Sequence, residues 1–188
     1  MADKKKDYFH DLYEVCVVIN SSLETHFLMK KIAEQLAASM HAKACSIRLL
    51  DQTGEALEPS TAFGLSKGYV HKGKVLIKKS QIDEEVLGSG KLVYIDDIST
   101  DKRWQYPEAA RTEGLASVLI APLKVEGRCI GVVRVYTAQK EQFTEEDREF
   151  LMAVTHLAAI SIENARLHQA LKADYELQAE FNYNVFED

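Results

Sequence analysis

Histidine and cysteine are the residues of this chain whose types could supply nucleophiles, general bases or metal ligands. The 188 residues include six histidines and three cysteines, Cys16, Cys45 and Cys129. The histidines form no H-E-x-x-H motif and lie near no cysteine in a nucleophile motif, and no two cysteines are spaced as C-x-x-C. We therefore expect no zinc site and no covalent catalytic centre, and interpret each cysteine as a small core residue.

Two arginines on predicted strands offer a different chemistry. Residues 45–50 and 129–136 are apolar and bounded by turn residues, which predicts strands in which one face is wholly apolar and the other is mixed. The mixed faces carry Ser46, Arg48 and Leu50 on the first strand and Val132, Arg134 and Tyr136 on the last. Guanidinium groups there would suit a carboxylate or phosphate. Alternatively, both arginines are half-exposed and paired with surface carboxylates.

The single tryptophan, Trp104, follows a loop that is rich in aspartate. Trp104 could close a pocket, or it could anchor a surface loop in which Asp97 and Asp101 cap turns. Calcium binding by Asp96, Asp97 and Asp101 would need more oxygen ligands at regular spacing than this loop offers. We expect no metal site in the chain.

The elements that must position these residues follow from periodicity and turn signals. Helices are expected at 8–19 and 24–41, strands at 45–50, 55–63 and 75–78, a helix that opens with an S-x-x-D cap at 80–83, a hairpin of 117–123 with 129–136, and a last helix capped at 143–147. Helices, then strands with a helical insertion, then a helix predict an α+β fold with an antiparallel sheet.

Composition excludes several classes of protein. Apolar residues make up 46% of the chain, enough for a core, and the length predicts one domain with an extension. The net charge of −6 leaves no basic face for nucleic acid. The longest apolar stretch, 118–123, is far short of the ~18 residues of a membrane helix, and the N-terminus lacks the pattern of a signal peptide. We expect a cytoplasmic protein with no nucleic-acid or membrane partner.

Four segments taken together resemble the GAF domain family. They are SVLIAPL at 117–123, GRCIGV at 127–132, FTEED at 143–147 and AAISIENARL at 158–167. The resemblance implies a central sheet of five to six strands, terminal helices on one face, and a helical and loop insertion over a pocket on the other. It divides the chain into an N-terminal helix for dimerisation or linkage at 1–20, the GAF domain at 21–171, and a helical extension or tail at 172–188.

The implied pocket brings the candidate ligand-binding residues together. We expect these to be Arg48, Arg134, Tyr136, Val132, Trp104 and Ile95, and expect the two arginines to favour a small anion. Bilin attachment would need a cysteine in the insertion, and the pattern around Phe143 and Asp147 departs from that of the cyclic-nucleotide binders. Neither bilin, haem nor cyclic nucleotide is therefore supported, and no cofactor is predicted.

The last helix carries two apolar stripes, which indicates two packing partners. One stripe would pack on the sheet, and the other would meet a second copy of the chain. The residues expected in this dimer interface are Leu157, Ile160, Asn164, Leu167 and Leu171 of the last helix, joined by Leu12 and Ile19 of the first. An asparagine within such a stripe favours two parallel helices in one register, so we expect a parallel homodimer.

These observations favour a GAF-type sensory or regulatory domain of signal transduction, which binds a small molecule and dimerises through its terminal helices. A second domain or a separate signalling protein would receive the output. An alternative is a ligand-free dimerisation module, and a weaker one is a redox enzyme of the free methionine sulfoxide reductase type. We expect the protein not to be an enzyme, because its cysteines lie on one helix and two strands and not around the implied pocket.

Overall fold

The computed structural model describes residues 7–59, 61–70 and 74–185, and the side chains as far as residue 178. Its helices are α1 (Tyr8–Ile19), α2 (Thr25–Ser39), α3 (Lys67–Val70), the 3-10 turn η1 (Ile77–Lys79), α4 (Gln81–Ser89), α5 (Pro107–Glu113) and α6 (Glu145–Val185). Its strands are β1 (Ala44–Leu49), β2 (Ala56–Leu57), β3 (Thr61–Phe63), β4 (Val75–Leu76), β5 (Val93–Ile95), β6 (Ser117–Val125) and β7 (Arg128–Thr137).

Within the described residues, five strands form one antiparallel sheet in the order β3-β1-β7-β6-β5. The long strands β1 and β7 are neighbours, with Ser46 opposite Arg134 and Arg48 opposite Val132. The predicted α+β fold with an antiparallel sheet is therefore confirmed. The segment predicted as a single partner of β1 is divided, because β3 pairs with β1 whereas β2 pairs with β4 in a separate two-stranded sheet.

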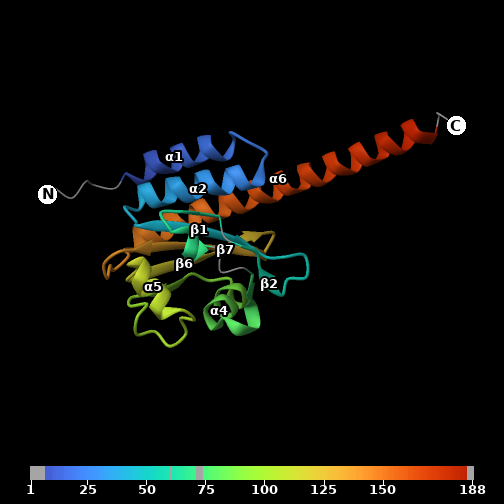
Figure 1. Ribbon diagram of the computed structural model, residues 1–188. Helices are drawn as coiled ribbons and strands as arrows, with labels where there is room; N and C mark the ends of the chain where they lie inside the picture. The colour runs from blue at the N-terminus through green and yellow to red at the C-terminus, as the bar shows by residue number, and fades with distance from the viewer. Residues whose placement is uncertain (1–6, 60, 71–73, 186–188) are drawn as a thin grey trace.

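Helices α2 and α6 cover one face of the sheet, and α1 packs on these two helices from the outside (Figure 1). The alternation of the strands sends mostly apolar side chains to this face, so sheet and helices share one large core. Thr61 of β3 is a polar exception, with its hydroxyl 3.2 Å from Nδ1 of His26 in α2. Fully buried members of this core include Ile47, Leu119, Val133 and Val135 from the sheet and Leu36, Val154 and Ile162 from the helices. The terminal helices thus pack on one face, as expected.

The start of α6 is held by a capping box and by α1. The backbone N–H of Thr144 donates to the Asp147 carboxylate at 2.7 Å, and the N–H of Asp147 donates to the Thr144 hydroxyl at 3.2 Å. Tyr8 of α1 donates its hydroxyl to the other oxygen of Asp147 and stacks on Phe150, with ring centroids 4.2 Å apart. These contacts fix α1 against the first turns of α6.

Helix α6 is much longer than the domain needs. It has 41 residues, and at about 1.5 Å per residue it measures about 60 Å. Among its side chains described as far as residue 178, the last fully buried one is Ala165, and beyond this point the helix leaves the body of the domain (Figure 1). Despite this length, α6 and the other helices of the described ranges are too polar or too short to span a bilayer.

The opposite face of the sheet is covered by α4, α5 and the connecting segments, which are drawn below the sheet in Figure 1. A second apolar cluster joins this layer to the sheet, with Ile82 and Val86 of α4 packed near Ile120 and Val132 of the strands. Gly131 of β7 permits the pairing of the central strands, because a Cβ there would lie 2.2 Å from the carbonyl oxygen of Arg48. This second layer encloses the candidate site.

Candidate functional site

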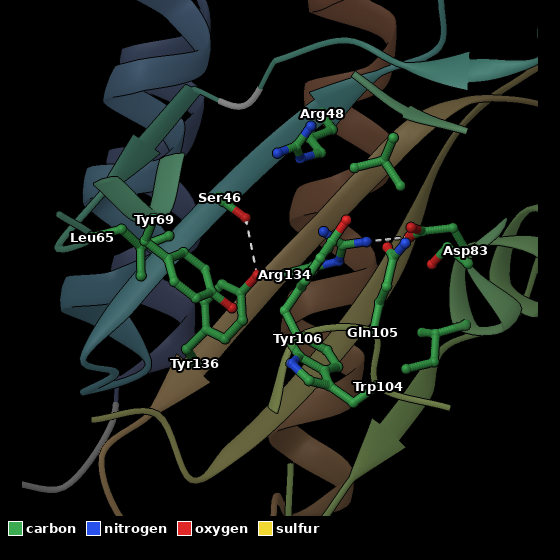
Figure 2. A pocket seen from close by; sticks show the side chains of 13 residues that line it. Ser46, Arg48, Leu65, Tyr69, Asp83, Trp104, Gln105, Tyr106, Arg134 and Tyr136 are labelled. Carbon is green, nitrogen blue, oxygen red and sulfur yellow. Dashed lines mark hydrogen bonds and ion pairs between the residues drawn. The ribbon is translucent and has the colours of Figure 1, made fainter. Parts of the chain in front are cut away.

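A pocket lies between the mixed face of β1 and β7 and the layer that contains α4 (Figure 2). It is lined by Ser46, Arg48, Leu65, Tyr69, Val75, Ser80, Ile82, Asp83, Trp104, Gln105, Tyr106, Arg134 and Tyr136. The space within it that the centre of a water molecule can reach is about 60 Å³. This exceeds the roughly 10–15 Å³ that is the least space for one water, so the pocket can admit a small molecule.

The structure brings four of the six candidate ligand-binding residues to this pocket. Arg48, Arg134, Tyr136 and Trp104 are all on its wall. Val132 and Ile95 are not, because their side chains are 1% and 2% exposed and belong to the apolar cluster beside the pocket. Val132 faces the correct side of β7, but the layer above covers it completely.

The two arginines differ in their surroundings. Arg134 donates from Nη2 to Asp83 of α4, whose side chain is fully buried. Burial alone would lower the pKa of Arg134, but the neighbouring Asp83 carboxylate outweighs this effect and raises it. Arg134 therefore remains charged, and Asp83 balances that charge inside the pocket.

Arg48 is 6% exposed and donates from Nη1 to the backbone carbonyl of Glu58 at 2.9 Å. Burial lowers the pKa of Arg48, and the nearby positive charge of Arg134 lowers it further. The alternative reading of two half-exposed arginines on surface carboxylates is therefore wrong for Arg48. For Arg134 a carboxylate partner is present, but it is buried and faces the pocket.

Aromatic side chains form the wall opposite Asp83 (Figure 2). Tyr136 meets Tyr69 and Trp104 edge to face, with ring centroids 6.4 Å and 6.3 Å away. The Tyr136 hydroxyl lies 3.5 Å from the hydroxyl of Ser46. Burial raises the pKa of Tyr69, so this phenol stays protonated at neutral pH. The wall is largely apolar and uncharged.

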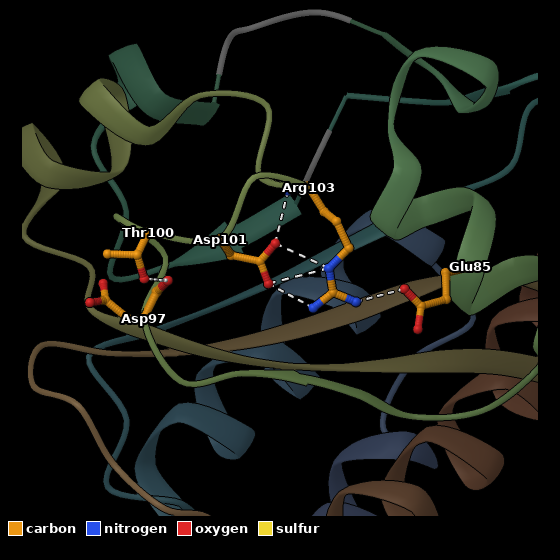
Figure 3. A network of polar contacts seen from close by, with 5 residues as sticks. All are labelled: Glu85, Asp97, Thr100, Asp101 and Arg103. Carbon is orange, nitrogen blue, oxygen red and sulfur yellow. Dashed lines mark hydrogen bonds and ion pairs between the residues drawn. The ribbon is translucent and has the colours of Figure 1, made fainter.

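The loop that carries Trp104 is tied to the rest of the second layer by ion pairs (Figure 3). Arg103 bonds to Asp101 in the loop and to Glu85 of α4, with Nη1 at 2.8 Å from the Glu85 carboxylate. Asp97 accepts from Lys140 at 2.6 Å, and the bonds from Lys140 and Ser99 lower its pKa to about 2. Asp97 and Asp101 also cap turns, as one interpretation predicted.

Asp83 is the residue of the site that the sequence reasoning missed. Ser80-x-x-Asp83 resembles a capping box, but although Ser80 occupies the N-cap of α4, its side chain makes no capping hydrogen bond. The carboxylate of Asp83 instead reaches Arg134. The spacing of Asp83 and Val86 is a signal that could have found it. Residues three apart are neighbours on a helix, so Asp83 lies on the same buried side of α4 as the apolar Val86.

The predicted dimer residues divide into two groups. On α6, Ile160, Asn164, Leu167 and Leu171 are exposed and Leu157 is partly buried. On α1, Leu12 and Ile19 pack instead against the core of their own domain. The exposed apolar side chains of α1 are Phe9, Tyr13 and Val17, which recur at every fourth residue and so share one side of the helix. The predicted residues Leu12 and Ile19 thus lie beside this exposed stripe and not within it.

The cysteines lie away from the pocket. Cys45 is buried in the core below the terminal helices, Cys16 is on α1, and Cys129 borders a surface groove beside α6. Burial raises the pKa of both Cys45 and Cys129, which disfavours the reactive thiolate. Among the described residues, no three His, Cys, Asp or Glu side chains gather as a metal site.

Comparison with known proteins agrees with this architecture. The methyl sulfide methyltransferase-associated sensor of Methanosarcina acetivorans is 27% identical over 153 residues, which cover 79% of this chain and 15% of that protein. The GAF domain of a phosphoenolpyruvate-protein phosphotransferase from Coxiella burnetii superposes with a TM-score of 0.78 at 18% identity, covering 89% of this chain and 99% of that one.

A third relative is an enzyme. The free methionine-R-sulfoxide reductase of Neisseria meningitidis, solved with its substrate, superposes with a TM-score of 0.71 at 17% identity, covering 89% of this chain and 95% of that one. At such identities the two solved structures show the fold alone. A sequence model of the GAF domain matches residues 23–163, which is well over half of the chain, and on this ground the chain belongs to the GAF domain family.

Proposed function

We propose that this GAF domain is a cytoplasmic sensory module of signal transduction, which binds a small ligand in the pocket and regulates its output as a homodimer. The observation that carries the proposal is that β7 serves both faces of the sheet. Arg134 and Tyr136 line the pocket, while the alternate residues Val133 and Val135 pack in the core below the terminal helices. A ligand on one face therefore touches a strand whose alternate residues share one apolar core with α6 on the other.

The ligand would act by preferring one arrangement of the helices. Binding shifts an equilibrium only to the extent that the ligand binds its two states with different affinity. A molecule held by Arg134 and Trp104 would change the packing of α4 and of the loop 96–106, both of which contact the sheet. Because cores repack in discrete steps, a small change there can move α6 as a unit.

The exposed stripe on α6 supports the homodimer. Ile160, Leu167 and Leu171 are 51%, 56% and 71% exposed, and with Asn164 they follow the 4-3-4 spacing of a coiled-coil seam. A second copy would bury these side chains, and Asn164 would pair with its counterpart and favour the parallel register. The exposed side of α1 would extend the same surface.

Light scattering tests the dimer. We expect twice the 21.2 kDa mass of the chain, and we expect Leu167→Glu with Leu171→Glu to give a folded monomer, because two buried charges would repel across the seam. Lys172→Glu is the matched control, since it also changes charge on this exposed segment but lies off the stripe. A wild-type monomer at tens of micromolar, or a dimer in the double variant, would contradict the parallel seam.

Native mass spectrometry tests ligand binding. We expect gently purified protein to carry an additional mass that is lost on denaturation, and Tyr136→Ala to lose that mass because the variant opens the aromatic wall. Phe63→Ala is the control, since Phe63 is an exposed aromatic residue outside the pocket. A native mass equal to that of the bare chain would favour the ligand-free dimerisation module.

The reductase alternative can be tested separately. Cys45 and Cys129 lie outside the pocket and are held as thiols, so we propose that the domain is not an enzyme. We expect no thiol-dependent reduction of free methionine sulfoxide by the purified protein. Turnover that disappears in Cys129→Ser, the variant of the more accessible of these two thiols, would contradict this part of the proposal.

A further inference from the structure

Three buried polar atoms around the pocket lack hydrogen-bond partners among the residues that the structure describes. They are Nε1 of Trp104, Nε of Arg134 and Oδ2 of Asp83. Folded proteins satisfy nearly all such atoms, so a group of three on one cavity is unusual. All three residues line the same pocket, but the three atoms themselves have almost no accessible surface there. A bound molecule that completes their hydrogen bonds must therefore displace these side chains slightly.

The three atoms define what that molecule must offer. Trp104 Nε1 and Arg134 Nε carry hydrogens and need an acceptor, whereas the Asp83 oxygen is a carboxylate acceptor and needs a donor. Arg134 meets Asp83 through Nη2 and Oδ1 only, which leaves one donor and one acceptor of the same ion pair without a partner. A group that donates and accepts side by side would satisfy both.

The position of the Asp83 carboxylate disfavours an anion at Arg134 Nε, although Arg48 gives the pocket wall one more positive than negative side chain. Asp83 balances Arg134, and its second oxygen would face any anion that approached Arg134 Nε. The expectation of a small anion rested on Arg48 and Arg134 without Asp83. With Asp83 included, an uncharged ligand avoids repulsion from the carboxylate and still meets the donors of Arg134 and Trp104.

We propose that the ligand of this pocket is a small uncharged molecule with a carboxamide-type edge, whose N–H donates to Asp83 Oδ2 and whose carbonyl accepts from Arg134 Nε or Trp104 Nε1. This inference rests on the proposed ligand-sensing function and specifies its chemistry. The rest of the molecule would contact the apolar side chains of Leu65, Val75 and Ile82. The pocket volume limits it to a few heavy atoms in this conformation.

Isobutyramide and isobutyrate are suitable probes, because they share one shape of about six non-hydrogen atoms and differ only in whether they can donate and in charge. Trp104 is the sole tryptophan of the chain, so its indole N–H gives one signal in a ¹⁵N-correlated NMR spectrum. We expect isobutyramide, titrated to about 100 mM, to shift this signal and to bind about tenfold tighter than isobutyrate, since only the amide donates to the carboxylate.

Asp83→Asn should reverse this preference. Arg134 Nη2 still needs an acceptor, so the amide oxygen of the variant would face Arg134 and its NH₂ group would take the place of Oδ2. The pocket would then donate at that point and would favour isobutyrate. Glu84→Gln is the matched control, because Glu84 is the next residue of α4, is exposed and does not line the pocket. It should leave the wild-type preference unchanged.

Each outcome decides the inference. Tighter binding of isobutyrate to the wild type would overturn the ligand class and leave the proposed sensing function intact. An Asp83→Asn variant that still prefers isobutyramide would overturn the role of Asp83. No shift with either probe would show that Asp83 and Arg134 satisfy each other in solution and would overturn the inference, while the native mass measurement judges the sensing function separately. If Asp83→Asn does not fold, the wild-type comparison alone decides.

Discussion

The two faces of the central sheet are built from alternate residues of the same strands, yet one forms an apolar core and the other carries buried charged residues. Below the terminal helices, Ile47, Val133 and Leu119 belong to one apolar core and are fully buried. On the other face, Arg48 and Arg134 are buried together with Asp83, and polar atoms remain without partners. The first face forms an apolar core, whereas the second borders the pocket.

The comparison separates stability from specificity. Apolar burial is non-directional and tolerates many packings, so the helical face can hold the fold without constraining a ligand. Buried charges are costly unless they are paired, and they fix direction and distance wherever they occur. The pocket face therefore contributes less net stability per residue and more chemical selectivity.

The largest expected effect comes from removing the ion pair between Asp83 and Arg134 on the pocket face. Asp83→Ala should lower the free energy of unfolding by about 3–5 kcal/mol, because it leaves Arg134 buried without its counter-charge. The double variant Asp83→Leu with Arg134→Met should be within about 1 kcal/mol of the wild type or more stable, since no charge remains buried. Urea denaturation measures both. If Asp83→Ala were as stable as the control Glu84→Ala, whose position is exposed, the result would contradict a buried ion pair between Asp83 and Arg134.

A cavity in the apolar core below the terminal helices should lower the free energy of unfolding somewhat less, and its structural effect should not reach the pocket. Leu119→Ala is expected to lower the free energy of unfolding by about 3 kcal/mol, because Leu119 is fully buried and its neighbours cannot collapse into the space. The Trp104 fluorescence of the folded variant should match that of the wild type. Leu23→Ala, at a 52% exposed position, is the control and should change stability by less than about 0.5 kcal/mol.

A substitution between the faces should disturb both. Gly131→Ala would press a methyl group against the Arg48 carbonyl and should cost about 1–3 kcal/mol while shifting the Trp104 signal. Gly88→Ala in α4 is the control, because a Cβ there meets nothing within 4 Å and alanine favours the helix by about 0.5–1 kcal/mol. Equal stability of the two variants would mean that β1 and β7 can separate freely.

The smallest expected effect concerns pH and the loop that carries Trp104. Asp97 has its pKa lowered to about 2 by Lys140 and Ser99, so its ion pair stabilises the folded state above the ordinary value of 3.8 and is lost as the pH falls toward 2. Lys140→Gln should raise the pKa of Asp97 toward 3.8 in an NMR titration. Lys102→Gln, at an exposed neighbouring position, should leave the pKa of Asp97 unchanged. An unshifted pKa of Asp97 in Lys140→Gln would exclude the ion pair between Lys140 and Asp97.

The helical face could be predicted from sequence more fully than the pocket. Strand alternation places Arg48 and Arg134 on one side, and the structure agrees, because a period of two is a local property. Asp83 could not be assigned in this way, since its partner is 51 residues away and its helix position also suits a cap. Burial of Val132 and Ile95 likewise depends on how closely α4 and the loop approach the sheet.

The choice between the two sides of α1 shows the same limit. Leu12 and Phe9 are both apolar, and the packing of α1 on α2 and α6, to which Tyr8 contributes, leaves Leu12 partly buried and Phe9 89% exposed. The pattern within a helix identifies its sides, but the contact that orients the helix comes from a distant segment. Long-range polar contacts such as those of Tyr8 and Asp83 carry this missing information.

Because α6 extends far beyond the domain, a small tilt of the helix at the sheet produces a large displacement at its far end. From Leu167, where the helix is exposed, to Val185 there are 19 residues by their numbering, or about 28 Å of helix at about 1.5 Å per residue. A tilt of only about 5° at the sheet would displace the far end by about 2.5 Å, more than the 1–2 Å helix shifts that rearrange subunit interfaces. A change too small to see at the pocket would thus be amplified into a displacement that an attached segment could detect.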